Sequence, residues 1–241
     1  MGFFDFLSRP GGPVSGANPE LAPLAPEATG STRIVQALLE LPRADRNRAW
    51  SQRFLAHVAD AAFFTRDPEV VLGAERLPFF ALHSTPAGQA CPAHVIHHLK
   101  DDFLLDRGLG VVINPCGQEA DWAFTYGDIL QFQLHGVFYP DQAGPERPVL
   151  TPQARLPQAA RKVVRTFLQG LGVAAPEVRF ASWDHAGPGS LELVFGFSPQ
   201  EFSSLDDFRF AMNNLAWFLP RNYSYSVAGN QARQDGGFEP L

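Results

Sequence analysis

Three histidines and two aspartates lie close together in one segment of the chain. They are His94, His97, His98, Asp101 and Asp102. Pro92 is suited to the first position of a helix, and the pattern predicts a helix over about 92–105. At about 100° per residue, the histidines and aspartates would share one face of that helix, opposite an apolar face.

This polar face has two interpretations. His94 and His98 are one helical turn apart, a spacing typical of metal-ligand pairs, and Asp101 would add a carboxylate for a divalent metal. However, separate polar and apolar faces are also what any surface helix shows. The segment HVIHH lacks the glutamate of the metalloprotease motif HExxH. We therefore favour a solvated surface and predict no cofactor, with a metal site or acid–base site as the alternative.

Other catalytic patterns are weak. Ser182, Asp184 and His185 supply the residue types of a hydrolase triad, but triads assemble in space rather than from neighbours, and the chain has no GxSxG elbow. The same residues suit a hairpin turn. Phosphate-binding loops of the GxGxxG and Gly-Lys-Ser/Thr types are also missing. We lean towards a protein that is not an enzyme.

Aromatic residues are the second notable feature. The chain contains 21 Phe against 4 Tyr and 4 Trp, and rings without a polar group should mostly be core. Phe3, Phe4 and Phe6 form an apolar cluster ahead of a stretch rich in Pro, Gly, Ala and Ser, so they either pack onto their own domain or dock a partner. Trp217 lies either in the core or at an interface with a partner. These four residues are the predicted partner-binding residues.

Charge and targeting signals narrow the classes of partner. The net charge is −6, Lys100 and Lys162 are the only lysines, and the arginines form no run, which argues against nucleic acid. No apolar stretch approaches the ~20 residues that span a bilayer, and the N-terminus lacks signal-peptide features. Cys91 and Cys116 have no zinc-finger spacing and are interpreted as reduced thiols. We expect a cytoplasmic protein whose partner is another protein.

The elements that would position these residues follow from periodicity and from Gly and Pro. Before the linker we predict helices at 31–41, 45–61 and 129–134 and strands at 77–83, 111–113 and 122–126. Beyond it we predict helices at 158–171 and 205–218 and strands at 178–183, 191–197 and 223–227.

These elements predict an α+β fold with two similar-sized helix/β-hairpin halves and mostly antiparallel sheet. The predicted parts are a flexible leader (1–30), an N-terminal half (31–140), a Pro-rich linker (141–152), a C-terminal half (153–228) and a loose tail (229–241).

Two short motifs carry a family resemblance. The segments GVVINP at 110–115 and YGDIL at 126–130 resemble the enhanced-serine-sensitivity (SseB-like) family of small bacterial proteins. The resemblance implies a bacterial, two-part α+β protein with no established catalytic residues. The leading functional hypothesis is a non-enzymatic binding or regulatory module that engages a protein partner. The alternative is a metal-binding protein or metal-dependent enzyme that uses His94 and His98.

Overall fold

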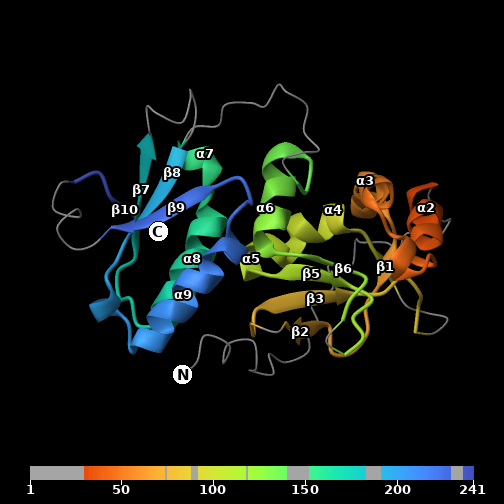
Figure 1. Cartoon of the computed structure of the whole chain (residues 1–241), viewed down its shortest axis with the longest axis horizontal. Coiled ribbons are helices and arrows are strands. Elements are labelled where there is room, and N and C mark those ends of the chain that lie inside the picture. The colour runs from red at the N-terminus through yellow and green to blue at the C-terminus, as the bar shows by residue number, and fades with distance from the viewer. Residues whose placement is uncertain are drawn as a thin grey trace. The chain divides into compact units, whose positions relative to one another are not determined.

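The computed structural model of the chain describes residues 30–73, 75–87, 92–117, 119–139, 152–182, 191–228 and 236–241. Within these residues the α+β fold is confirmed (Figure 1). The chain divides into two compact units between Gln142 and Ala143. The predicted leader (1–30) and linker (141–152) lie outside the described residues, apart from one residue of each. None of the helices that the structure describes is long and apolar enough to cross a membrane.

The N-terminal unit begins with two helices. They are α2 (Gly30–Leu39) and α3 (Arg48–His57), separated by the short turn η1 (Arg43–Asp45) and followed by the turn η2 (Val58–Asp60). The second helix begins at Arg48 rather than at the predicted 45, because Asn47 caps it: the Asn47 side-chain oxygen accepts a hydrogen bond from the Trp50 amide at 3.1 Å. The Trp50 indole nitrogen donates to the Leu38 carbonyl at 2.8 Å, which ties α3 to α2.

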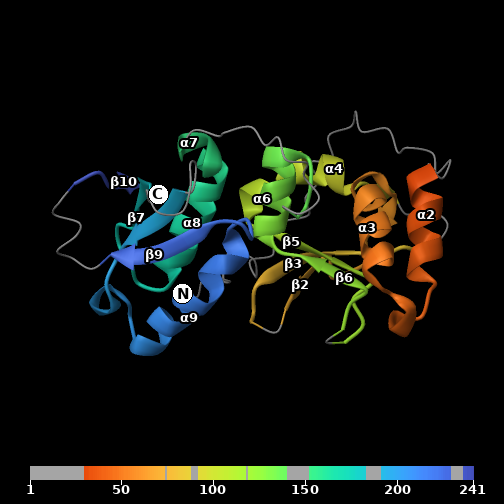
Figure 2. The ribbon, with the colours of Figure 1, turned by 45° about the horizontal axis from the view of Figure 1, so that its top comes forward.

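A four-stranded sheet forms the centre of this unit. Its strands, in the order β2-β3-β5-β6, are β2 (Val70–Leu72), β3 (Pro78–Leu82), β5 (Gly110–Ile113) and β6 (Trp122–Phe124). The β3–β5 pair is parallel and the other two pairs are antiparallel. The apolar core lies between one face of the sheet and the helices, and Figure 2 shows α4 and α6 on the same side of the strands.

The connection from β3 to β5 differs from the predicted single helix over 92–105. It contains β4 (Ala93–His94), α4 (Ile96–Leu99), a π-helical turn η3 (Lys100–Leu104) and α5 (Leu105–Arg107). The prediction is wrong at its start, because β4 pairs with the distant strand β1 (Phe63–Phe64). Helical structure therefore begins after His94, and Gly108, with φ 67°, ends it in the left-handed conformation.

The helix α6 (Tyr126–His135) closes the unit. Thr125 and Asp128 form a capping box, in which each side chain accepts a hydrogen bond from the other residue's backbone amide, at 3.1 and 2.9 Å. This cap starts the helix three residues before the predicted 129. Gly136 has φ 70° and ends the helix, as its position in the sequence predicts.

The C-terminal unit follows its predicted elements to within one residue. They are α8 (Gln158–Gly170), β7 (Glu177–Ser182), β8 (Leu191–Gly196), α9 (Leu205–Phe218) and β9 (Ser224–Ala228), preceded by the short helix α7 (Pro152–Arg155). The sheet order is β10-β7-β8-β9, with β8 and β9 parallel and the other pairs antiparallel.

The predicted loose tail is wrong for residues 236–241. Strand β10 (Glu239–Pro240) pairs with β7, and Leu241 is only 3% exposed. Glu239 forms an ion pair with Arg161 at 3.0 Å. The polar, Gly-rich residues that precede β10 gave no sign that the segment after them pairs with a sheet, because the pairing depends on a strand about 60 residues away.

Both units contain the same succession of elements. A helix leads into an antiparallel hairpin, and the second strand of that hairpin continues through a helical crossover into a parallel neighbour. In the N-terminal unit these elements are α3, β2, β3, the α4–α5 connection and β5; in the C-terminal unit they are α8, β7, β8, α9 and β9. The similarity lies in the topology.

Candidate functional site

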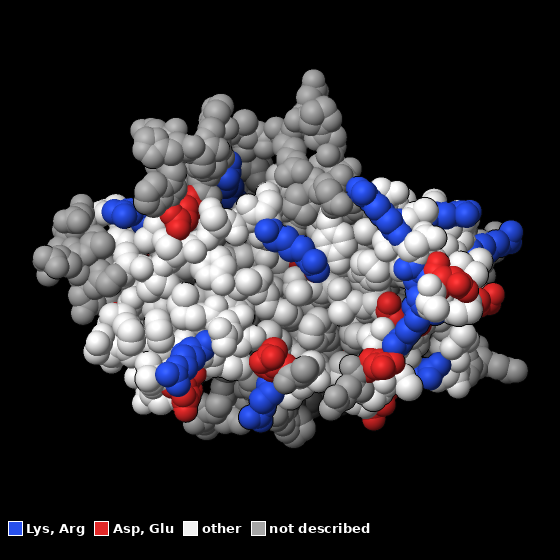
Figure 3. Space-filling model, in the orientation of Figure 1, with Lys and Arg blue, Asp and Glu red and all other residues white. Residues whose placement is uncertain are grey.

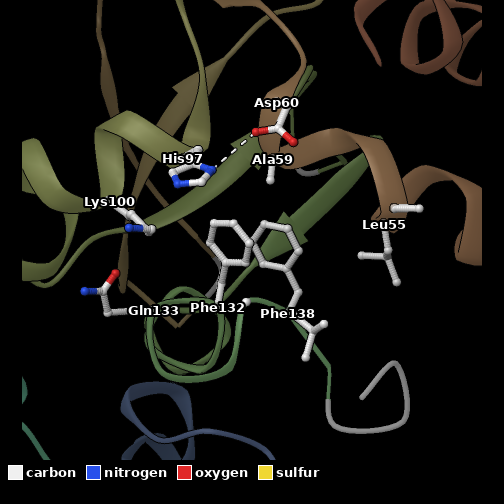
Figure 4. Close-up of a pocket in the computed structure, with 11 residues that line it drawn as sticks. Leu55, Ala59, Asp60, His97, Lys100, Phe132, Gln133 and Phe138 are labelled. Atoms are coloured by element: carbon white, nitrogen blue, oxygen red, sulfur yellow. Dashed lines mark hydrogen bonds and ion pairs between the residues drawn. The ribbon is translucent and has the colours of Figure 1, made fainter. Parts of the chain in front are cut away.

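A pocket of about 580 Å³ opens in the N-terminal unit where α3, η2, α4, η3 and α6 meet (Figure 4). Polar and apolar groups contribute about equally to its lining, and the apolar side chains include Leu55 and Ala59 on one wall and Phe132 on another. The polar residues that line it are Asp60, His97, Lys100 and Gln133. The volume and this mixture of residues are typical of ligand-binding sites.

A stack of three rings lies beside the pocket. The centroids of Phe132 and Phe138 are 4.5 Å apart, with an angle of 14° between the ring planes. Phe132 belongs to α6, and the left-handed turn at Gly136 reverses the chain, which brings Phe138 back against it. Phe138 also stacks on Phe124 of β6 at 4.2 Å, so it lies between two rings and is only 1% exposed. The stack therefore joins α6 to the sheet.

Asp60 and His97 form a pair at the mouth of the pocket. The Nδ1 atom of His97 lies 3.3 Å from Oδ1 of Asp60, and the two side chains are 54% and 65% exposed. The His97 and Phe132 rings meet edge to face, with centroids 5.7 Å apart and ring planes at 88°. Ion pairs this exposed contribute little to stability. The pair can still donate and accept hydrogen bonds at the mouth.

Lys100 is the charged group that lies deepest. Its side chain is only 9% exposed, although lysine is almost never buried without a partner. Nζ lies 2.5 Å from Oδ2 of Asp101 and 6.0 Å from the centroid of the Phe132 ring. Lys100 is also the first residue of the π-helical turn η3. Such turns are rare and recur at functional sites.

The structure separates the predicted metal ligands. His94 lies in β4, whereas His98 belongs to α4 and Asp101 to η3, so the histidines are not one helical turn apart. Burial lowers the pKa of His94, while the carboxylates of Glu69 and Asp102 act in the opposite direction. Within the described ranges, no group of three or more His, Cys, Asp and Glu side chains is placed to hold a metal ion.

The other predicted site residues are spread over the chain. Phe3, Phe4 and Phe6 lie outside the described residues, as do Asp184 and His185. Trp217 is half-buried on α9 of the C-terminal unit, where its ring meets Phe218 edge-on with centroids 4.9 Å apart.

Sequence reasoning missed most of the residues around the pocket. Of its polar groups only His97 belongs to the predicted polar face. Lys100 had a usable signal, because it is one of two lysines and is followed directly by Asp101 and Asp102. Phe132 and Phe138 are two among 21 Phe, and Asp60 stands alone, so nothing local distinguishes them.

A second polar cluster lies at the carboxyl ends of the parallel strands β3 and β5. The Asn114 side chain accepts from the Ser84 amide at 2.8 Å and donates to the Asp121 carboxylate at 2.8 Å, and Arg46 pairs with the other oxygen of that carboxylate at 2.7 Å. Asn114 has φ 48°, a left-handed conformation that Asn tolerates better than most residues. The cluster joins the segment between η1 and α3 to the ends of β3 and β5 and to the start of β6, and it accounts structurally for the Asn of the GVVINP segment.

Charge gives no further site on the visible surface. On the face that Figure 3 shows, the described Lys and Arg side chains lie apart from one another, and several lie beside acidic residues. Comparison of the chain with protein-family models, curated proteins and solved structures finds no match. The resemblance to the SseB-like family stays a prediction. The functional argument therefore depends on the pocket.

Proposed function

We propose that this protein is a non-enzymatic binding or regulatory module that engages a protein partner through the pocket of its N-terminal unit. The observation that carries the proposal is the pocket itself, in which apolar side chains from α3, η2 and α6 lie beside the polar groups of Asp60, His97 and Lys100. Interfaces concentrate their binding energy in such places, where a partner's side chain enters an apolar pocket that polar groups surround.

The polar groups of the pocket can take part in hydrogen bonds with a partner. Asp60 pairs with His97, and Lys100 pairs with Asp101. Nucleophilic catalysis by a hydroxyl or thiol needs a Ser, Thr or Cys next to a base, and none of these is among the described residues that line the pocket. Hydrogen bonding to a partner requires no further group.

Apolar surface on α2 supports the same proposal. A shallow groove of about 310 Å³ lies beside α3, lined by Ile34, Ala37 and Leu41 among others. Leu41 is one of the few large apolar side chains that the described residues expose. A partner that enters the pocket beside α3 would find further apolar contact there.

A photo-crosslinking experiment in the source cells tests the proposal. A benzophenone amino acid at Gln133, an exposed residue that lines the pocket, should form an adduct with one defined protein. The same amino acid at Gln52, an exposed residue of α3 that does not line the pocket, should not. Ala56→Arg, which places a long side chain into the pocket from α3, should abolish the Gln133 adduct, and Gln52→Arg should leave it unchanged.

The purified partner should then bind the wild-type chain saturably, and Ala56→Arg should weaken this binding by at least about tenfold. The proposal is wrong if the Gln133 adduct survives Ala56→Arg, or if the probe at Gln52 captures the same protein equally well.

A further inference from the structure

We infer that residues 20–27, which precede α2 in the chain, occupy the apolar groove between α2 and α3, with the Glu27 carboxylate at Arg33 and Arg53. These residues lie outside the described part of the chain. The inference follows from the shape of the groove, from its two arginines and from the order of residues in the segment. It does not depend on the proposed function, although a partner that reaches α2 would have to displace residues 20–27 first.

The outer side of α2 is unusually apolar for a surface helix. Val35 and Leu38 are buried towards the core of the unit. Ile34, Ala37 and Leu41 follow one another at intervals of three and four residues, and all three line the groove of about 310 Å³. Ala37 is exposed and Leu41 is 43% exposed. An apolar segment laid in the groove would remove this surface from water, which is favourable.

Helices α2 and α3 lie side by side (Figure 2) and run in opposite directions. The Ser31 hydroxyl lies 3.3 Å from Nδ1 of His57, which joins the start of α2 to the end of α3. The Trp50 indole nitrogen donates to the Leu38 carbonyl near the other end. Residues early in α2 therefore lie beside residues late in α3.

This arrangement places Arg33 and Arg53 at one end of the groove and Leu41 at the other, because each arginine is within about one turn of the Ser31–His57 contact. Both arginines are exposed, and neither forms an ion pair within the described ranges. The other residues that line the groove are all apolar. The groove therefore suits a segment with a carboxylate at one end and apolar side chains beyond it.

The segment ELAPLAPE has this composition. Pro23 and Pro26 favour an extended polyproline-II conformation, which has three residues per turn. Leu21, Leu24 and Glu27 are three residues apart, so they would share one side of the segment. That side carries two apolar side chains followed by one carboxylate.

The length and direction of the segment also fit the groove. Side chains three residues apart in this conformation are separated by about 9 Å, and Ile34 and Leu41, two helical turns apart, by about 10 Å. Only two residues separate Glu27 from the start of α2. A chain that turns back along α2 at this point therefore places Glu27 beside the two arginines and its leucines progressively nearer to Leu41.

The short connection favours this segment over a separate molecule as the occupant. A segment on a short linker is present at an effective concentration on the order of millimolar. Its prolines restrict it before it binds, so it loses less conformational entropy than an unrestricted chain would.

A disulfide experiment on the full chain tests where the segment lies. Both native cysteines are replaced by serine (Cys91→Ser, Cys116→Ser). Ala25→Cys and Ala37→Cys then add one thiol to the segment and one to the groove. The matched control combines Ala25→Cys with Ala56→Cys, because Ala56 is an exposed alanine of α3 that lines the other pocket. Equilibration in glutathione buffer followed by mass spectrometry gives the effective concentration of each thiol pair.

The effective concentration should be at least about tenfold higher for the groove pair than for the control pair. Glu27→Arg should lower it to the control value, and Arg33→Glu together with Arg53→Glu should restore it in that background. Leu24→Ser should lower it without a change of charge.

Equal values for the groove pair and the control pair overturn the inference, as does a value that neither Glu27→Arg nor Leu24→Ser changes. Disulfide-linked dimers in place of monomers also overturn it, because the groove would then hold the segment of a second copy. All the substituted positions in α2 and α3 are exposed, so the variants should fold, and circular dichroism checks this.

Discussion

Lys100 and Phe132 face one another across the edge of the pocket, with the ammonium nitrogen 6.0 Å from the centroid of the ring. The charge of this buried side chain is balanced by Asp101, which is itself 56% exposed. The two members of the ion pair therefore differ in what their removal leaves behind. Removal of the lysine leaves an exposed carboxylate, whereas removal of the carboxylate leaves a buried ammonium.

This asymmetry predicts the stability of two variants. Lys100→Met keeps the apolar stem and should change the free energy of unfolding by less than about 1 kcal/mol. Asp101→Asn leaves the ammonium group with a neutral acceptor and should lower the free energy of unfolding by about 1–3 kcal/mol. Urea denaturation of both variants measures the difference. Equal effects would mean that the pair is too well solvated for burial of Lys100 to matter.

Substitution of Asn114 should lower the free energy of unfolding for two separable reasons. Its side chain links Ser84 to Asp121, and its φ of 48° is strained for a residue with an ordinary Cβ. Asn114→Ala loses both advantages, whereas Asn114→Gly loses only the hydrogen bonds. We expect the alanine variant to be less stable than the glycine variant by about 1–2 kcal/mol, with both below wild type. Urea denaturation checks the order, and a more stable alanine variant would contradict the strain.

Two glycines provide a matched test of packing in the N-terminal unit. A Cβ at Gly110 would lie 2.6 Å from the Phe124 carbonyl oxygen and 2.8 Å from the Phe79 ring, whereas a Cβ at Gly136 would meet nothing within 4 Å. Gly110→Ala should therefore disrupt the sheet and lower the free energy of unfolding by about 3 kcal/mol or more. Gly136→Ala should cost only about 1–2 kcal/mol, through its positive φ. Circular dichroism during thermal unfolding distinguishes the two, and similar melting temperatures would contradict the close approach at Gly110.

The sequence predicts those parts of the fold that local patterns determine. Helix α9 has a serine cap, a periodic apolar stripe and Pro220 beyond its end, and its predicted bounds match the structure. Gly136 likewise ends α6 where its conformational freedom predicts. The prediction for the residues of β4 is wrong for the opposite reason, because a distant contact determines this strand. His94 pairs with Phe63, some 30 residues earlier, and helical periodicity over 92–105 carries no trace of that contact.

The candidate site shows the same limit. The helical pattern predicted that His97 belongs to a polar face, because its neighbours are polar. The ring stack beside the pocket requires Phe138 to return across Gly136 onto Phe132, and the mouth of the pocket requires Asp60 to approach from another turn. Both are tertiary contacts between residues of common types. In addition, the π-helical turn that begins at Lys100 changes the angle between successive side chains around the helix axis. A helical wheel drawn at 100° per residue therefore places the residues after Lys100 on the wrong face.

Two half-buried histidines, His83 and His94, should make stability depend on pH. Burial lowers the pKa of His94 below its ordinary 6.5, and burial together with Arg66 lowers that of His83. A folded-state pKa below the unfolded value means that the unfolded chain binds protons more readily as the pH falls. The free energy of unfolding should therefore be highest above pH 6.5 and decrease below it.

His94→Gln removes one of these groups and should flatten the decrease between pH 6.5 and pH 5 in urea titrations, with His83→Gln acting in the same direction. The same slope in His94→Gln and in wild type would show that the imidazole of His94 is solvated in the folded protein.

The C-terminal strand gives the last prediction. Leu241 is 3% exposed and its amide donates to the Pro176 carbonyl at 3.1 Å, whereas the Glu239 carboxylate pairs with Arg161 from a half-exposed position. Leu241→Ala removes buried apolar surface and should lower the free energy of unfolding by about 2–3 kcal/mol. Glu239→Gln loses only a partly solvated ion pair and should cost less than about 1 kcal/mol. Urea denaturation measures both, and a loose tail, which the composition of residues 229–241 predicted, would make both substitutions silent.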